Sequence, residues 1–429
     1  MADQTRDIDL IVIGAGPAGL AAAIATRRAG VMDLAVLERE EEPGGILNQC
    51  IHNGFGLHRF KEELTGPEYA WRDIQEAREL DIDIRCGTMA LDITADKVVT
   101  AVSRERGLET FRARAIILAM GCRERPRGAL AIPGTRPAGV FSAGTAQKMV
   151  NMMGYMPGRE VVILGSGDIG LIMARRMTLQ GARVRACVEL MPYSSGLNRN
   201  IVQCLEDYDI PLLLSHTVVD VKGRNRVTGV TIARVGDDRL PIPGTQQDIP
   251  CDTLLLSVGL IPENELSLSA GVSLAADTQG PVVNNRFETN VPGIFACGNV
   301  LHVHDLVDFV SQESALAGQA AARAISGYDD KAAEVPVVDG PGVRGTVPQR
   351  LLIPEGEAPE ATTLMFRPDR VYHNHHLHLI AGDRVLYSQR RRIMTPGEMA
   401  SVDLTAQMMA VLRDEASLRL EISPEKRGV

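Results

Sequence analysis

This sequence has few aromatic residues, no closely spaced cysteine pair, no long apolar run and no excess of positive charge, and each of these absences argues against a class of function or location. Phe, Trp and Tyr make up only 4% of the 429 residues, so a surface that stacks nucleic-acid bases is not expected. The formal net charge of −9 likewise argues against nucleic acid and anionic membrane surfaces as partners. No apolar run approaches the roughly 20 residues that a membrane-spanning helix needs.

The spacing of the cysteines indicates the cellular compartment of the protein and does not indicate a disulfide or metal site. All seven are scattered singly, and no C-x-x-C pair occurs. This usage predicts reduced thiols in a cytoplasmic protein. The short acidic N-terminus, residues 1–9, does not have the pattern of a secretory signal. The chain is long enough for two or three domains with cores of their own.

A strand–glycine–helix pattern near the N-terminus dominates what the sequence does contain. Residues 10–13 are four apolar residues typical of a buried strand, and an Ala-rich helix is predicted shortly after them. Between the two lie glycines in G-x-G-x-x-G spacing, namely Gly14, Gly16 and Gly19. The first makes a tight turn, the second lets the backbone approach a pyrophosphate, and the third lets helix and strand pack closely. The helix N-terminus favours the anion.

The same pattern recurs in the middle of the chain. Residues 160–164 form a second buried strand, and a helix is predicted after the next glycines, Gly165, Gly167 and Gly170. In both units a further strand ends on an acidic residue that can accept hydrogen bonds from a ribose. Glu38 lies 24 residues after Gly14, and Glu189 lies 24 residues after Gly165. The repetition predicts two dinucleotide sites in one chain.

Glu189 also bears on which nicotinamide cofactor is used. A carboxylate can bind a ribose 2′-hydroxyl but repels a 2′-phosphate, so NADH is favoured over NADPH. Arg183 and Arg185 could reverse this preference if a loop brought either of them into reach.

The remaining signals predict an α/β protein with two Rossmann-like domains, the second inserted in the first. A strand over 112–118, another over 251–256 and a helix over 312–325 complete the pattern. Pro and Gly over 333–349 indicate a linker, and a small α+β extension follows it. The predicted division is 1–155 with 280–332 for the first domain, 156–279 for the inserted domain, 333–349 for the linker and 350–429 for the extension.

The two glycine motifs, the strand end at 119–121 and the segment 293–299 together resemble the two-dinucleotide-domain flavoprotein superfamily, which includes glutathione reductase and thioredoxin reductase. The resemblance covers about residues 8–327 and implies FAD in the first site and NAD(P)H in the inserted one. The FAD contacts it implies are Gly14, Gly16, Pro17, Ala18, Gly19, Glu38, Arg39, Gly45, Asn48, Ala119, Gly121, Gly298 and Asn299. The NAD contacts it implies are Gly165, Gly167, Asp168, Ile169, Gly170, Glu189 and Gly259.

Within this span, residues 44–56 and 121–126 are similar to a narrower group, the FAD/NAD subunits of multi-component bacterial dehydrogenases. This group lies beside glycerol-3-phosphate dehydrogenase-like flavoproteins and has relatives in sarcosine oxidase, opine dehydrogenase and hydrogen cyanide synthase. The similarity implies a hetero-oligomer in which a separate flavoprotein subunit oxidises a small substrate such as glycerol 3-phosphate, an opine or an amino acid. A small iron–sulfur subunit is a further candidate partner.

Two departures from the superfamily pattern leave alternatives open. Asn299 stands where an Asp is usual, so it can still hydrogen-bond but brings no charge. Only Cys50 stands near the position of the reductases' cysteine pair, and dithiol chemistry needs a second thiol. Cys50 is therefore either a packing residue or the redox thiol of a free-standing NADH-dependent peroxidase or disulfide reductase. The third hypothesis, beside the dehydrogenase subunit and the peroxidase or disulfide reductase, is a scaffold subunit that binds nucleotide without turnover.

Histidines supply the other candidate catalytic group. His52, His58, His302 and His304 flank segments expected to approach the flavin, and we select His304 as the candidate that donates to it or moves a proton. The His-rich run over 373–378 could bind a metal ion, but no carboxylate or cysteine nearby in the sequence completes a set of ligands. We therefore expect no metal.

Overall fold

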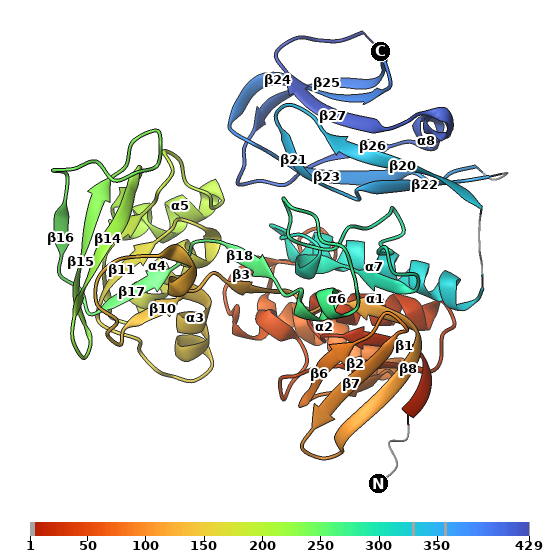
Figure 1. Ribbon diagram of the computed structural model, residues 1–429. Coiled ribbons are helices and arrows are strands. Elements are labelled where there is room, and N and C mark those ends of the chain that lie inside the picture. The colour runs from red at the N-terminus through yellow and green to blue at the C-terminus, as the bar shows by residue number, and fades with distance from the viewer. Residues whose placement is uncertain (1–4, 328–330, 356–357, 429) are drawn as a thin grey trace. The chain divides into compact units, whose positions relative to one another are not determined.

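The computed structural model describes residues 5–327, 331–355 and 358–428, and the chain divides into two compact units (Figure 1). One unit comprises residues 1–122 and 262–429, and the other comprises 123–261. The first four residues of the acidic N-terminus lie outside the described residues. The second unit is thus inserted in the first, and the chain passes between them at β9 (Cys122–Glu124) and β18 (Leu260–Pro262), which pair with each other.

The first unit is built on a seven-stranded sheet whose centre is parallel. The strands follow the order β5 (Asp83–Arg85), β2 (Leu34–Leu37), β1 (Thr5–Ile13), β8 (Gly107–Leu118), β7 (Val98–Ser103) and β6 (Thr88–Ile93), with β19 (Ile294–Ala296) also on β8. Strands β5, β2, β1, β8 and β19 pair in parallel, whereas β6, β7 and β8 form an antiparallel meander. The parallel strands are continuous apolar runs because both of their faces are covered.

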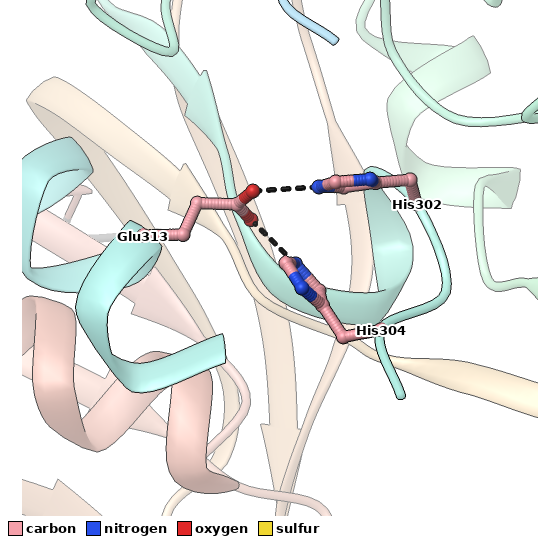
Figure 2. A group of neighbouring side chains, drawn as sticks. All are labelled: His302, His304 and Glu313. Atoms are coloured by element: carbon pink, nitrogen blue, oxygen red, sulfur yellow. Dashed lines mark hydrogen bonds and ion pairs between the residues drawn. The ribbon is translucent and has the colours of Figure 1, made fainter. Parts of the chain in front are cut away.

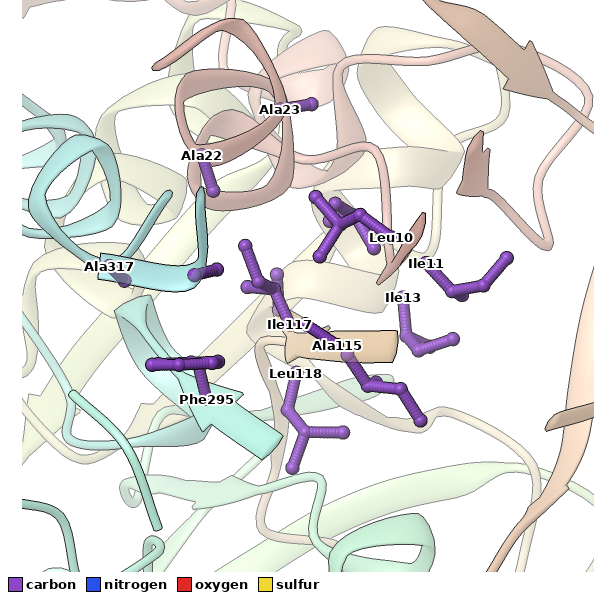
Figure 3. Packing of buried hydrophobic residues seen from close by; sticks show 14 of the residues in the cluster. Leu10, Ile11, Ile13, Ala22, Ala23, Ala115, Ile117, Leu118, Phe295 and Ala317 are labelled. Atoms are coloured by element: carbon purple, nitrogen blue, oxygen red, sulfur yellow. The ribbon is translucent and has the colours of Figure 1, made fainter. Parts of the chain in front are cut away.

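Helices α1 (Pro17–Arg28) and α7 (Val307–Ile325) pack closely against each other beside this sheet. Small residues allow the approach: a Cβ on Gly318 would lie 2.3 Å from the Ala22 carbonyl oxygen. Figure 3 shows Ala22 and Ala317 of the two helices near the strand residues Ile117 and Phe295. Helix α2 (Gly66–Glu79) begins with a capping box in which Thr65 and Glu68 satisfy each other's backbone amides.

The second unit has a parallel sheet with a three-stranded antiparallel sheet beside it. The parallel order is β10 (Val140–Ser142), β17 (Thr253–Leu256), β11 (Glu160–Leu164), β12 (Arg183–Val188) and β13 (Leu212–Leu213). Helices α3 (Ala143–Asn151), α4 (Asp168–Leu179) and α5 (Asn198–Cys204) accompany it. The antiparallel strands are β14 (His216–Gly223), β15 (Val227–Arg234) and β16 (Gln247–Ile249).

The unit boundaries fall earlier in the chain than the expected 155/156 and 279/280. Because β10 pairs with β17 and α3 contacts α4, residues 140–151 belong with the second unit. On the return, α6 (Glu265–Ser269) contacts β6, so the first unit resumes at residue 262.

The C-terminal extension lies in the first unit and has a core of its own that includes Phe366, Leu379 and Leu420. One of its sheets has the order β22 (Arg350–Pro354), β20 (Ala332–Asp339), β27 (Leu418–Ser423), β24 (Tyr372–Ala381) and β25 (Arg384–Met394). The other has the order β21 (Val343–Val347), β23 (Thr362–Pro368) and β26 (Ala400–Leu404), and α8 (Ala406–Val411) follows.

The expected linker over 333–349 is wrong, because β20 and β21 occupy most of it. Pro336 is tolerated where β20 changes partners: residues 332–336 pair antiparallel with β22, and residues 337–339 pair in parallel with β27. A proline that ends one ladder removes little hydrogen bonding, so its presence does not interrupt the strand.

Candidate active site

The first glycine turn is fixed by contacts within the chain at two of its three glycines. Gly14 has a φ of +103°, and a Cβ there would lie 2.6 Å from the Ala119 carbonyl oxygen. A Cβ on Gly19 would lie 1.8 Å from the Gly14 carbonyl oxygen. The turn therefore brings the end of β1, the start of α1 and the end of β8 together, and only glycine fits at these two positions.

Gly16 differs from its neighbours because nothing in the described chain requires it to be glycine. Its φ is −74°, and a Cβ there would meet only the Cα of Gly45, at 4.0 Å. Helix α1 begins beside it with Pro17, without a side-chain cap and without an acidic residue in its first turn. An uncapped helix N-terminus beside an open glycine matches the demands of a bound pyrophosphate.

The segment that contains Gly45 lies against this turn. The Gly44 amide donates to the Ala15 carbonyl oxygen at 2.8 Å, and a Cβ on Gly45 would lie 2.9 Å from the Gly16 Cα. Asn48 lies on the following 3-10 helix, η1 (Gly45–Gln49), and its side-chain amide donates to the Pro43 carbonyl oxygen at 3.0 Å. Three of the predicted FAD residues, Gly16, Gly45 and Asn48, are thus brought to one place.

The two predicted ribose carboxylates accept hydrogen bonds from corresponding backbone amides in the two units. Glu38 accepts hydrogen bonds from the Ala15 and Glu40 amides at 2.7 and 2.9 Å. Glu189 accepts from the Ser166 and Met191 amides at 2.8 and 2.9 Å. Each carboxylate is 6% exposed and bonds the residue directly after the first glycine of its own motif. Arg39, next to Glu38, is exposed.

The second glycine turn repeats the mechanical features of the first. Gly165 has a φ of +95°, and a Cβ there would lie 1.9 Å from the Ser257 carbonyl oxygen. A Cβ on Gly170 would lie 2.7 Å from the Ser257 Cβ, so this glycine is also required by packing. Gly167 is the N-cap of α4, and Ile169 lies in the first turn of this helix. Gly259 follows β17 with a φ of +101°.

Asp168 distinguishes the start of α4 from the start of α1, which has no acidic residue in its first turn. It is the first residue of α4, and its Oδ1 accepts from the Leu197 amide at 2.8 Å and from the Asn200 side chain at 2.7 Å. The carboxylate therefore ties the start of α4 to the start of α5. Its negative charge also occupies a helix end that would otherwise attract a phosphate.

Gly298 and Asn299 lie beside the first glycine turn. A Cβ on Gly298 would lie 2.7 Å from the Cβ of Ala18, next to the start of α1. The Asn299 side-chain carbonyl accepts from the His304 amide at 3.1 Å, and its amide group contacts the Cys122 sulfur at 3.6 Å. Gly121 lies between Ala119 and Cys122 with a φ of +72°, and a Cβ there would meet nothing within 4 Å.

Cys50 is partly buried, and its thiol donates to the Ile46 carbonyl oxygen at 3.3 Å. Burial raises the pKa of this thiol to about 12. At neutral pH the group is therefore a thiol rather than the thiolate that peroxidase or disulfide chemistry requires. The seven cysteines all lie within the described residues, and none of them forms a disulfide.

The candidate His304 belongs to a buried cluster with His302 and Glu313 (Figure 2). Glu313 lies in α7, and the two histidines lie between the 3-10 helix η4 (Gly298–Val300) and α7. Neither Glu313 nor the pairing of the histidines was predictable from local spacing. Within the described residues this is the one group of at least three metal-ligating side chains whose ligand atoms lie within 4.8 Å of each other.

The other histidines do not join this group. His52 is half-buried and packs against Phe55, whereas His58 packs against Phe309 of α7. In β24, His376 and His378 share one face, and the Nε2 of His378 bonds the Ser423 hydroxyl at 3.0 Å.

The fold and the two dinucleotide turns define a flavin- and nicotinamide-dependent oxidoreductase. Residues 8–326 match the family model described as pyridine nucleotide-disulphide oxidoreductase, and the chain belongs to this family. It is therefore an FAD- and NAD(P)-dependent enzyme. Among the described residues, no helix has the length and apolar character needed to cross a membrane.

Named relatives cover the same part of the chain. Thioredoxin reductase of Listeria innocua is 29% identical over 70% of this chain and 88% of its own length. An opine oxidase subunit of Agrobacterium tumefaciens is 29% identical over 69% of this chain. The small chain of glutamate synthase [NADPH] of Escherichia coli is 28% identical, also over 69%. The alignments cover 62% and 64% of the latter two proteins, so the chain spans under two thirds of each.

Among solved structures, the thioredoxin reductase of T. acidophilum matches with a TM-score of 0.61 and 25% identity, over 74% of this chain and 98% of that one. The Lactococcus lactis thioredoxin reductase matches with the same TM-score of 0.61 and 22% identity, over 75% of this chain and all of that one, which shows the fold. These matches confirm the predicted pair of Rossmann-like domains.

Proposed function

We propose that this chain is the NADH-using FAD subunit of a multi-subunit dehydrogenase. The observation that carries the proposal is the repeated half-site: in each unit a glycine turn leads into a helix, and a buried carboxylate accepts a hydrogen bond from the residue after the first glycine. Bound FAD would supply the capacity to accept hydride from a reduced nicotinamide. The chain's own residues bind and orient the two cofactors.

FAD binding is assigned to the first unit. The pyrophosphate is placed at Gly16 and the start of α1, because a Cβ at Gly16 would make only one ordinary contact with the chain, at 4.0 Å from the Gly45 Cα. Glu38 keeps lone pairs for ribose hydroxyls beyond its two backbone bonds. Gly298 and Asn299, which lie beside α1, are placed at the flavin end of the cofactor.

NADH is assigned to the second unit in preference to NADPH. Glu189 is buried, and its three hydrogen bonds from Ser166 and Met191 keep its charge in place. Neither arginine named above is placed to offset it: Arg185 pairs with Glu160 at the start of β11, and Arg183 begins β12, whereas Glu189 follows the end of that strand. A 2′-phosphate at this position would therefore meet a carboxylate whose charge Arg185 does not offset.

Stopped-flow reduction of the flavin tests this proposal directly. At matched concentrations, NADH is expected to bleach the yellow colour at least about tenfold faster than NADPH, a difference of about 1.4 kcal/mol. An Arg185→Ala variant serves as the control and should keep the ratio. Equal or faster reduction by NADPH would contradict the assignment, and absence of bleaching by either would favour a scaffold role.

The partner subunit is the second part of the proposal. Both the opine oxidase relative and the glutamate synthase small chain are named as parts of larger enzymes, which supports a similar arrangement here. Arg59, which follows the segment 44–56, pairs with Asp73 at 2.6 Å and is not free to hold a substrate phosphate. The purified chain should therefore not oxidise glycerol 3-phosphate, opines or amino acids with a dye acceptor. Isolation of the native protein should recover a second, substrate-oxidising flavoprotein.

The peroxidase or disulfide-reductase alternative is not proposed. Its nucleophile would be Cys50, and burial holds this group in the thiol form.

A further inference from the structure

His302 presents a buried hydrogen-bond acceptor that no group in the described chain satisfies. Its side chain is 3% exposed, and its Nε2 lies 2.6 Å from Oε2 of Glu313. Its other ring nitrogen, Nδ1, is buried without a hydrogen-bond partner. A buried polar atom left in this state costs about 1–3 kcal/mol, so a group from outside the chain is expected to meet it.

Glu313 determines which ring nitrogen carries the proton. Its side chain is 1% exposed, and its Oε1 accepts from the Gly298 amide at 2.7 Å and lies 3.2 Å from the Nε2 of His304. Burial would raise the pKa of Glu313, but the two neighbouring histidines outweigh it and hold the pKa well below its usual range. An ionised carboxylate can only accept hydrogen bonds, so Nε2 of His302 donates.

The Nδ1 atom is therefore left as a lone-pair acceptor. Burial lowers the pKa of His302 below its ordinary value, which keeps the ring neutral. In a neutral imidazole with its proton on Nε2, Nδ1 can only accept. The missing partner must be an N–H or O–H donor.

The location of the cluster indicates which ligand supplies this donor. The carboxylate that orients His302 also bonds the amide of Gly298, and the amide of His304 bonds the side chain of Asn299. Gly298 and Asn299 are the pair assigned to the flavin end of FAD. We propose that Nδ1 of His302 accepts a hydrogen bond from a hydroxyl or N–H of the bound FAD, with Glu313 as the residue that positions it. This inference rests on the proposed FAD site.

A metal ion at the same cluster fits the geometry less well. The 2.6 Å separation between Nε2 and Oε2 is that of a direct hydrogen bond, with no room for an ion between the two atoms. A metal-bound histidine also usually donates its second N–H to a protein group, whereas Nδ1 of His302 has no partner among the described residues.

Two substitutions of His302 separate the roles of its nitrogens. Asn places a polar atom near the position of Nδ1, and Gln places one near the position of Nε2. If Nδ1 holds FAD, His302→Asn should keep an FAD Kd within a few-fold of wild type, and His302→Gln should weaken it about tenfold or more. If His302 only holds Glu313 in place, His302→Gln should instead keep the FAD Kd and His302→Asn should weaken FAD binding.

The measurement is FAD titration of the apoprotein by fluorescence quenching, with the absorption spectrum of the bound flavin as a second readout. Glu313→Gln is expected to shift this spectrum. His378→Gln, at a buried histidine in β24, is the matched control, and it should change neither the FAD Kd nor the spectrum. Wild-type-like FAD affinity in His302→Gln would overturn the inference. One equivalent of zinc that is retained by the wild-type protein and lost in Glu313→Gln would also overturn it. Failure of the wild-type apoprotein to bind FAD would instead refute the proposed function.

Discussion

Gly16 allows ligand binding to be separated from folding at a single residue. Because a Cβ at this position meets only the Gly45 Cα at 4.0 Å, Gly16→Ala should fold normally. The added methyl group points into the space assigned to the pyrophosphate, so FAD affinity should fall about tenfold or more, at least about 1.4 kcal/mol. Thermal unfolding of the apoprotein and FAD titration measure the two effects.

The matched control for this change is Gly128→Ala, since a Cβ on Gly128 meets nothing within 4 Å and the residue lies outside both glycine turns. This variant should keep both stability and FAD binding. An unchanged FAD affinity in Gly16→Ala would remove the main support for placing the pyrophosphate there.

Cys50 is predicted to be chemically inert in the folded protein. With a pKa raised to about 12, its thiolate fraction at pH 8 is lower by about three orders of magnitude than that of an ordinary thiol. Iodoacetamide labelling followed by peptide mass spectrometry should show slow modification of Cys50 in the native state and fast modification after denaturation. Equal rates of Cys50 modification in the native and denatured protein would support the peroxidase hypothesis.

At the scale of single residues, spacing alone predicted the geometry of the first turn. Gly14 and Gly19 lie where a side chain has no room, and both roles depend on a fixed offset within one strand–turn–helix unit. Glu38 as the ribose ligand stays a prediction. Glu313 was not predictable, since its contact with Gly298 becomes visible only after the helix of Glu313 has folded back over the turn. The missing partner of His302 Nδ1 is also a property of burial, which spacing does not encode.

At the scale of elements, strand β23 of the extension holds the loop that carries His304. Arg367 donates to Asp305 at 2.5 Å and to the Val303 carbonyl oxygen at 3.1 Å, and the Met399 amide donates to Asp305 at 2.6 Å. These contacts were not predictable from the sequence, because nothing in one strand's periodicity indicates what its end touches. The extension therefore has a structural role inside the first unit.

The Arg367 contact predicts a measurable effect on the flavin. Arg367→Ala leaves Asp305 with one hydrogen bond fewer and frees the loop, so the bound FAD should become more fluorescent and its Kd should rise several-fold. Arg370→Ala, a nearby arginine that contacts Tyr372 instead, is the control. If both variants behave as wild type, the loop is held without the extension.

For the molecule as a whole, the first unit should depend on its C-terminal part. Val347 is buried in the core of the first sheet, and the Gln349 side chain accepts from the Val283 amide at 2.9 Å. A tail on a flexible linker would be dispensable, but deletion of residues 334–429 should here lower the melting temperature and release FAD. Retention of a stoichiometric, NADH-reducible flavin by the truncated chain would contradict this expectation.

The inserted unit, by contrast, should function alone. Residues 123–261 are continuous, and their two cores are built from β11, α4 and β12 on one side and from β15 and β17 on the other. Both the second glycine turn and Glu189 lie inside this segment. The fragment should therefore fold cooperatively and bind NADH, but carry no flavin.

The fragment also makes the measurement clean, because it would carry no flavin, whose absorption and emission overlap those of NADH. Without that background, enhancement of NADH fluorescence reports binding directly, and circular dichroism reports folding. Glu189→Ala in the fragment should weaken NADH binding about tenfold. Arg185→Ala should not, because this side chain is paired with Glu160. A folded fragment that does not bind NADH, while the full chain does, would show that the nicotinamide site needs residues of the first unit.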